Sequence, residues 1–218
     1  MTSEEFVESL RAENQEALER LGRLSRAGTV AEDLTVSRLL RIALKNELEA
    51  TEVAAIWLAT TPELDVKLAL ARQVGDEAKH YRLISERLEE MDVDTSRIDP
   101  REGGYSELFY YLSQLASTVQ RVAAGHFTRE GIALVRNEAF IEFCLARGDK
   151  RTAALYKDVI QKDEWHHHET GRRLLERYAL DEEQQTAARL AARKTIQLAE
   201  EIQEMARIKA GIGHAPGC

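Results

Sequence analysis

Hydrophobic residues recur every three or four positions along most of the chain, a spacing that predicts amphipathic helices. Four long runs predict the helices of a core bundle, at about 33–59, 62–91, 127–147 and 151–178. A shorter run at about 108–119 predicts a crossover helix, and segments at about 3–24 and 181–208 predict accessory helices. We therefore expect a single all-α domain over 1–218, a four-helix bundle with a core of about 33–180 and extra N-terminal, crossover and C-terminal helices.

Turn-forming residues separate these runs. Thr61 and Pro62 predict a cap followed by the first position of a new helix, and residues 148–150 predict a tight turn. The polar stretch 92–104 predicts a linker, although no second domain follows from it. The tail 211–218 has no apolar periodicity and is expected to fray.

Each core run carries a glutamate at a position where its apolar stripe predicts a buried side chain. The four residues are Glu47, Glu77, Glu138 and Glu164. Glu77 and Glu164 are each followed, three residues later on the same helix face, by His80 and His167. The two motifs read DEAKH and DEWHH, so an aspartate also precedes each of these glutamates.

The glutamate of the third run has a competitor. Glu142 lies one helical turn after Glu138 and only about 40° around the helix from it. In an antiparallel hairpin that turns near residue 149, Glu138 would lie ~6 Å from the level of Glu164, whereas Glu142 would lie ~12 Å from it. Glu138 is therefore the favoured residue.

Other residues near the two motifs have alternative interpretations. Asp76 could hydrogen-bond His167 across the bundle, and Asp163 could do the same for His80, which would fix the orientation of each ring. A role as ordinary exposed acids explains both aspartates equally well. His168 could replace His167 if the last core helix were rotated or bulged.

Buried carboxylates need compensating cations, because an isolated charge in an apolar interior costs several kcal/mol. No lysine or arginine lies on these stripes near the acids, whereas two divalent metals would neutralise four carboxylates and accept one imidazole each. Oxygen and nitrogen ligands without thiolate favour iron, with manganese or zinc as alternatives. The ordinary alternative is that the acids lie on solvated faces and the histidines are interior residues. The predicted metal ligands are Glu47, Glu77, His80, Glu138, Glu164 and His167.

From about Leu34 to Tyr178 the chain resembles the ferritin-like di-iron carboxylate superfamily. The stretches NELEATEVAAIWLA, DEAKHYRLISERLEEM and NEAFIEFCLARGDKRTAALYKDVIQKDEWHHH are especially similar to an uncharacterised bacterial ferritin-like family. The resemblance implies the same ligands and a di-iron centre that reacts with dioxygen or peroxide. It does not imply a particular substrate.

Charge and composition narrow the choice of partners. The 30 Lys and Arg residues against 38 Asp and Glu give a net charge of -8, which disfavours nucleic acid. The longest apolar stretches, such as 53–59, are far shorter than the ~20 residues of a membrane span, and no signal peptide is evident. Neither Cys144 nor Cys218 suggests a disulfide framework. We expect a cytoplasmic protein that forms a homodimer.

The leading functional hypothesis is a di-iron, or mixed manganese–iron, oxidoreductase that uses dioxygen or peroxide to oxidise a small organic substrate, with a reductase as electron donor. One alternative is a ferroxidase that handles iron. Another is a tRNA-modifying hydroxylase, for which Arg172, Arg173 and Arg177 could form a basic rim. A purely structural bundle is the remaining alternative.

Overall fold

A computed structural model describes residues 1–27, 34–212 and 215–217, and every regular element within these ranges is helical. The long helices are α1 (Ser3–Ala27), α2 (Val36–Thr60), α3 (Leu64–Glu89), α6 (Glu130–Ala146), α8 (Gln161–Tyr178) and α9 (Glu182–Ala210). The short elements are η2 (Thr95–Arg97), α4 (Glu107–Ser113), α5 (Thr118–Val122) and α7 (Lys150–Leu155), together with the π-helical segments η3 (Ala123–Arg129) and η4 (Tyr156–Ile160). The all-α prediction is confirmed.

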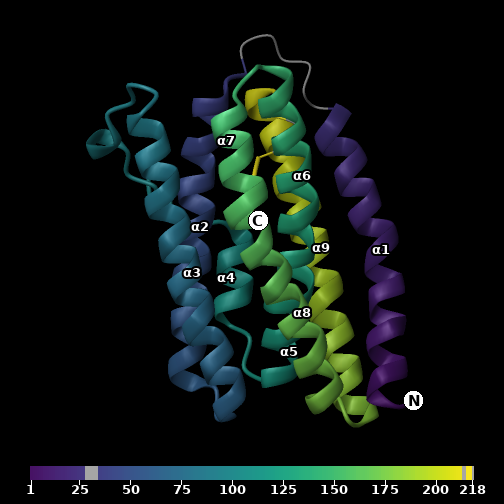
Figure 1. The fold of residues 1–218 in the computed structure, drawn as a ribbon. Helices are drawn as coiled ribbons and strands as arrows, with labels where there is room; N and C mark the ends of the chain where they lie inside the picture. Colours follow the sequence, from purple (N-terminus) through teal and green to yellow (C-terminus); the bar gives the residue numbers. More distant parts are fainter. Residues whose placement is uncertain (28–33, 213–214, 218) are drawn as a thin grey trace.

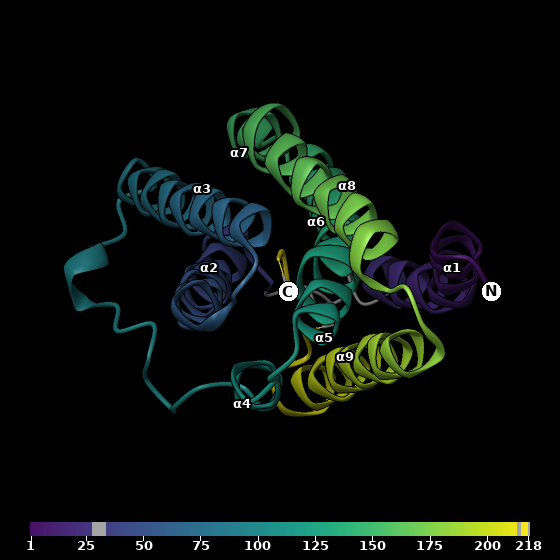
Figure 2. The same cartoon turned by 90° about the horizontal axis from the view of Figure 1, so that it is seen from below.

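Two antiparallel hairpins form the centre of the bundle (Figure 1). One hairpin is α2 and α3, and the other joins η3 and α6 to α7, η4 and α8. Seen along the helices in Figure 2, α9 lies beside α5, and α1 lies on the side of α6 away from α2. Both accessory helices therefore cover the second hairpin.

Proline sets the first turn. The residue before a proline avoids the helical conformation, so α2 ends at Thr60 and Thr61 is extended, with φ -80 and ψ 129. The Thr61 N–H still donates to the carbonyl of Trp57 at 2.9 Å. Pro62 is not the first helical residue as predicted, because α3 begins at Leu64.

The other connections follow ordinary capping chemistry. Asp149 caps α7 by accepting a hydrogen bond from the Thr152 N–H at 3.0 Å, and Gly148 has the positive φ of 75 that the tight turn requires. The predicted linker over 92–104 contains only the short turn η2. The expected crossover helix is divided into α4 and α5, because Ser117 starts a new helix with a capping box.

Each arm of the second hairpin contains a π-helical segment, which widens one turn and changes the direction of the side chains that follow. Glycines allow η3 to pack closely. A Cβ on Gly125 would lie 2.5 Å from the Trp57 ring, and a Cβ on Gly171 would lie 2.7 Å from the main chain of His126. These contacts fix η3 against both α2 and α8.

Buried apolar residues form one cluster towards each end of the central helices, and a polar layer lies between them. On α3, Leu70 belongs to one cluster and Ile84 to the other. On η4 and α8, Ile160 and Leu174 belong to different clusters in the same way. Within the described ranges no helix combines the length and the apolar character needed to cross a lipid bilayer.

The tail after α9 was predicted to fray, and this prediction is wrong for its described residues. Ile212, Pro216 and Gly217 are buried. The Asn46 side-chain amide donates to the Pro216 carbonyl at 2.8 Å, and the Gly217 N–H donates to Oδ1 of Asn137 at 2.8 Å. Pro216 and Gly217 therefore lie between α2 and α6, inside the ring of helices (Figure 2).

Candidate metal centre

Four carboxylates and two imidazoles meet in the polar layer, and all six side chains are buried. Their ligand atoms form two groups, and within each group the atoms all lie within 4.8 Å of one another. One group contains Glu47, Glu77, His80 and Glu164, and the other contains Glu77, Glu130, Glu164 and His167. Glu77 and Glu164 belong to both groups, so each group adds one glutamate and one histidine of its own.

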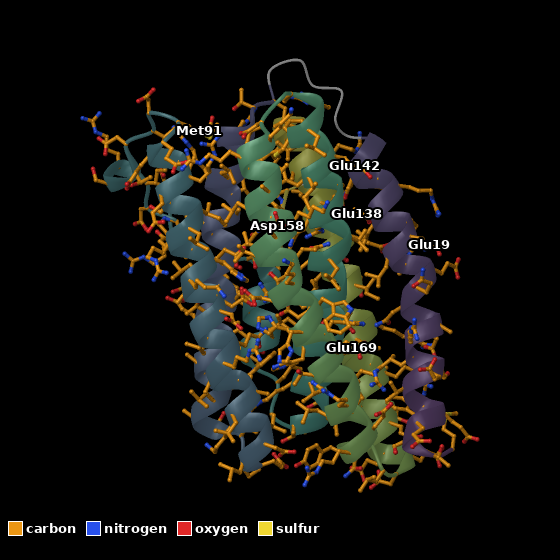
Figure 3. The ribbon with its side chains drawn as sticks, in the orientation of Figure 1. Glu19, Met91, Glu138, Glu142, Asp158 and Glu169 are labelled. Atoms are coloured by element: carbon orange, nitrogen blue, oxygen red, sulfur yellow. The ribbon has the colours of Figure 1, made fainter. Side chains whose placement is uncertain are left out.

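The structure brings together five of the predicted ligands: Glu47, Glu77, His80, Glu164 and His167. The sixth, Glu138, is not among them. Glu138 lies on the exposed face of α6, and so does its competitor Glu142 (Figure 3). Glu130, which is fully buried at the start of α6, lies in the cluster instead.

The hydrophobic pattern favoured Glu138 over Glu130 because α6 is apolar on more than one side. The stripe through Glu138 has helical spacing, but so does the buried set 130, 133, 137, 140 and 144. α6 contacts both α1 and α8, so two of its faces require apolar side chains. Glu130 lies 19 residues before residue 149, which gives the same ~6 Å offset from the level of Glu164 that favoured Glu138. That spacing was a usable signal for Glu130.

The predicted aspartate contacts are present in the structure. Oδ2 of Asp163 lies 3.1 Å from Nε2 of His80, and Oδ2 of Asp76 lies 3.2 Å from Nε2 of His167. Lys79 donates to Asp76 at 3.0 Å and to Asp163 at 2.6 Å, which ties the two aspartates together. These contacts turn Nδ1 of each histidine towards the glutamates.

Several nitrogen and oxygen atoms of the cluster that could bind a metal make no hydrogen bond within the part of the chain that the structure describes. They are Nδ1 of His80, Nδ1 of His167, Glu47 Oε1, Glu130 Oε2 and Glu164 Oε2. The His80 Nδ1 lies 3.4 Å from Glu77 Oε2, and the His167 Nδ1 lies 3.5 Å from Glu164 Oε2. Two ligands that share one ion at about 2.1 Å lie about 3.0–3.4 Å apart, so the spacing fits shared cations.

His168 is not part of the cluster. Its Nδ1 donates to the Phe127 carbonyl at 2.7 Å, and its ring stacks on that of Phe127 with centroids 4.8 Å apart. The contact joins α8 to η3. His167 therefore keeps the assignment that the sequence favoured.

A buried arginine lies beside the cluster, contrary to the expectation from the stripes. Nη1 of Arg129 is 3.4 Å from Glu130 Oε1, which also accepts a hydrogen bond from Gln73 at 2.6 Å. A single guanidinium compensates only part of the charge of four carboxylates. Protons or metal ions must therefore balance the rest of the charge.

Two other buried groups lie close to the cluster. The His126 ring centroid is 6.5 Å from that of His167, and neither of its nitrogens has a hydrogen bond among the described residues. Burial lowers the pKa of His126 to about 3, so the ring is neutral. Burial, followed by the charge of Glu47, raises the pKa of Tyr156. His126 is thus an interior residue, 1% exposed.

Burial and contacts among the cluster residues shift their pKa values. Burial raises the pKa of Glu47 to about 8. Burial alone would lower the pKa of His167, but the hydrogen bond to Asp76 and the nearby carboxylate of Glu164 raise it to about 9. Burial, and then the charge of Glu164, raises the pKa of Glu130 well above its usual value. At neutral pH the metal-free cluster therefore holds protons on groups that would have to lose them to bind metal.

Metal binding is expected to release protons and to strengthen as the pH rises. Glu47 and His167 are protonated below about pH 8 and about pH 9, so a metal must displace their protons at neutral pH. Affinity should rise about tenfold per pH unit for each proton displaced, and the slope should decrease once Glu47 and His167 have lost their protons. Competition with a chelator between pH 6 and pH 10 measures this slope. An affinity that does not change with pH would contradict the assignment.

The aspartate contacts should tune metal affinity. Replacing Asp163 by asparagine removes the carboxylate that orients His80 and is expected to weaken metal binding about 10- to 100-fold. Asp158, whose side chain is 61% exposed on η4, provides the matched Asp158→Asn control. Isothermal titration with Mn²⁺ compares the two variants, and equal affinities would show that Asp163 has no orienting role.

Fold and site together define an all-helical bundle whose interior holds a Glu/His cluster able to bind metal. The chain matches, over residues 12–215, a family described as protein of unknown function (DUF455), and it belongs to that family. Neither a curated protein nor a solved structure shows significant similarity to it.

Proposed function

We propose that this protein is a ferritin-like oxidoreductase that binds two iron ions, or one manganese and one iron, and uses dioxygen or peroxide to oxidise a small organic substrate. The observation that supports the proposal is the pair of donor groups that share Glu77 and Glu164. Carboxylate and imidazole donors without a thiolate suit iron and manganese. The same donor inventory is characteristic of ferritin-like dimetal proteins.

The position of each residue in the cluster determines which ion it would bind. Glu47 and His80 would hold one ion, Glu130 and His167 would hold the other, and Glu77 with Glu164 would lie between them. The aspartates keep the histidine rings in place, and the apolar clusters at both ends exclude water. When bound, the metal pair supplies the redox chemistry.

Anaerobic loading with Fe²⁺ followed by exposure to oxygen tests the proposal. The protein should take up two irons per chain and then show an oxygen-dependent absorption change, which Glu77→Ala should abolish and Glu138→Ala should preserve. Uptake of two irons with no response to oxygen or peroxide would refute the oxidoreductase. Continued accumulation of ferric iron beyond two per chain would favour the ferroxidase alternative.

The structure gives little support to the tRNA alternative. Arg172 pairs with Glu169 and Glu176, and Arg177 pairs with Asp65. These arginine charges are thus partly neutralised by neighbouring acids, which weakens a basic rim for a phosphate backbone. A tRNA mobility shift that disappears with salt would overturn this preference.

A further inference from the structure

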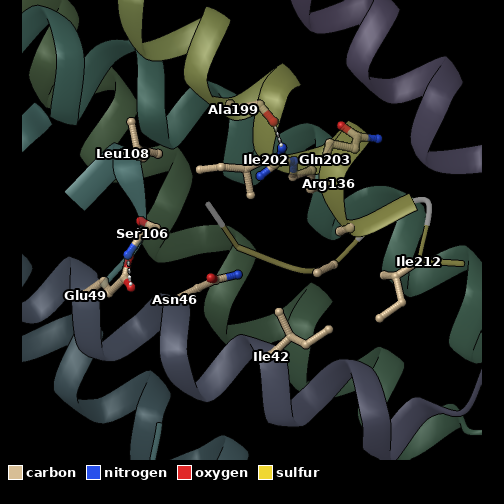
Figure 4. Close-up of a pocket in the computed structure, with 12 residues that line it drawn as sticks. Ile42, Asn46, Glu49, Ser106, Leu108, Arg136, Ala199, Ile202, Gln203 and Ile212 are labelled. Carbon is tan, nitrogen blue, oxygen red and sulfur yellow. Dashed lines mark hydrogen bonds between the residues drawn. The ribbon is translucent and has the colours of Figure 1, made fainter. Parts of the chain in front are cut away.

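A small cavity lies between α2, α4, α6, α9 and the tail (Figure 4). Its volume is about 90 Å³. Most of its wall is apolar, formed by Ile42, Leu108, Ala199, Ile202, Ala206 and Ile212. A few polar side chains complete the wall: Glu49 accepts hydrogen bonds from Ser106, Arg136 donates to the Ala199 carbonyl at 2.9 Å, and Gln203 donates to Ser25 at 3.3 Å. The cavity therefore suits a predominantly apolar molecule.

The tail separates this cavity from the candidate metal centre. Ala215 lines the cavity, as does Asn46. Two residues further along the tail, a Cβ on Gly217 would lie 3.6 Å from Oε1 of Glu47. The main chain between Ala215 and Gly217 thus passes from the cavity wall to the side of a cluster glutamate.

Two asparagines hold this part of the tail through its main chain. Asn46 on α2 donates to the Pro216 carbonyl, and Asn137 on α6 accepts from the Gly217 N–H. Asn137 is fully buried, a position where an amide is unfavourable unless it has a partner. Each hydrogen bond contributes only modestly, so the tail can be displaced without unfolding the bundle.

We propose that this cavity is the substrate site, that it takes a small and predominantly apolar organic molecule, and that residues 215–217 are a displaceable partition between that molecule and the metals. The identification of this molecule as a substrate rests on the proposed function. The cavity and the partition rest on the contacts above. An apolar cavity of about 150 Å³ holds benzene. A cavity of about 90 Å³ is smaller than this, and displacement of the tail would supply the missing space.

Benzene, followed by NMR titration, is the probe for the cavity. Asn137→Ala, which releases Gly217, should bind benzene about tenfold more tightly than the wild type. Adding Ala206→Phe fills the cavity and should remove the binding, whereas adding Met205→Phe, on the exposed face of the same helix, should not. If Asn137→Ala does not fold, as judged by circular dichroism, Asn46→Ala releases the tail from the other side.

Access to the metals gives an independent readout. In Mn²⁺-loaded protein, Asn137→Ala should accelerate removal of the metal by EDTA about tenfold, while Ala206→Phe alone should leave the rate unchanged. Benzene binding that survives Ala206→Phe, or absence of benzene binding in both tail-release variants, would overturn the inference. So would an EDTA rate that releasing the tail does not change. Benzene binding requires no metal. If the protein binds benzene through a cavity that Ala206→Phe fills but takes up no metal on loading, the proposed function fails while the inference about the cavity stands.

Discussion

Replacing Glu77 or Glu164 by alanine is expected to remove both metal ions from the chain, whereas replacing Glu130 should weaken only one. Glu77 and Glu164 supply ligand atoms to both donor groups, and Glu130 supplies one group. Loss of an orienting partner already lowers metal affinity about 10- to 100-fold, so loss of a ligand should lower it by at least about 100-fold. Metal content per chain, measured after loading with Mn²⁺ and gel filtration, distinguishes the Glu77 and Glu164 variants from the Glu130 variant.

The matched control lies on α6 itself. Glu138→Ala removes an exposed carboxylate from the same helix as Glu130 and should retain both ions. Full stoichiometry in Glu77→Ala and Glu164→Ala would show that the buried cluster does not bind the metal. Loss of metal in Glu138→Ala would restore the assignment made from the sequence.

Metal binding is also expected to raise the melting temperature of the protein by about 10–20 °C. At a free metal concentration of 100 times the Kd, each site should add about 2.7 kcal/mol to the free energy of unfolding. Two sites would add about 5 kcal/mol, and 1 kcal/mol shifts the melting temperature of a domain of this size by about 2–4 °C. Scanning calorimetry of metal-free protein with and without Mn²⁺ measures the shift.

The double variant Glu77→Gln with Glu164→Gln separates metal binding from packing. It keeps the shape of both side chains. Burial alone would raise the pKa of Glu77, but His80 and then His167 lower it below its usual value, so the ionised carboxylate stabilises the metal-free protein and the variant should start from a lower melting temperature than the wild type. Its melting temperature should not respond to Mn²⁺. An equal response in the variant and the wild type would place the stabilising metal elsewhere.

Local patterns were enough to predict most of the site. The Glu-x-x-His spacing places His80 beside Glu77 and His167 beside Glu164 in any helix. The turn at Pro62 then brings Glu47 level with Glu77 in the first hairpin. These inferences need only helix geometry and one turn, and five of the six predicted residues lie together in the structure.

The remaining features depend on packing that periodicity does not encode. α6 is covered on two faces, so its stripe did not distinguish Glu138 from Glu130. The tail docks through main-chain hydrogen bonds to Asn46 and Asn137, which leave no apolar pattern in the tail sequence. Arg129 is buried within the π-helical segment η3, a departure from α-helical geometry that the 3.6-residue period does not predict.

Anomalous scattering from crystals of the Mn²⁺-loaded protein would test the central assignment most directly. We expect two peaks about 3.5–4 Å apart, one beside Nδ1 of His80 and one beside Nδ1 of His167, with Glu77 and Glu164 between them. A map with no peak in the polar layer, or with metal only on the protein surface, would contradict the account.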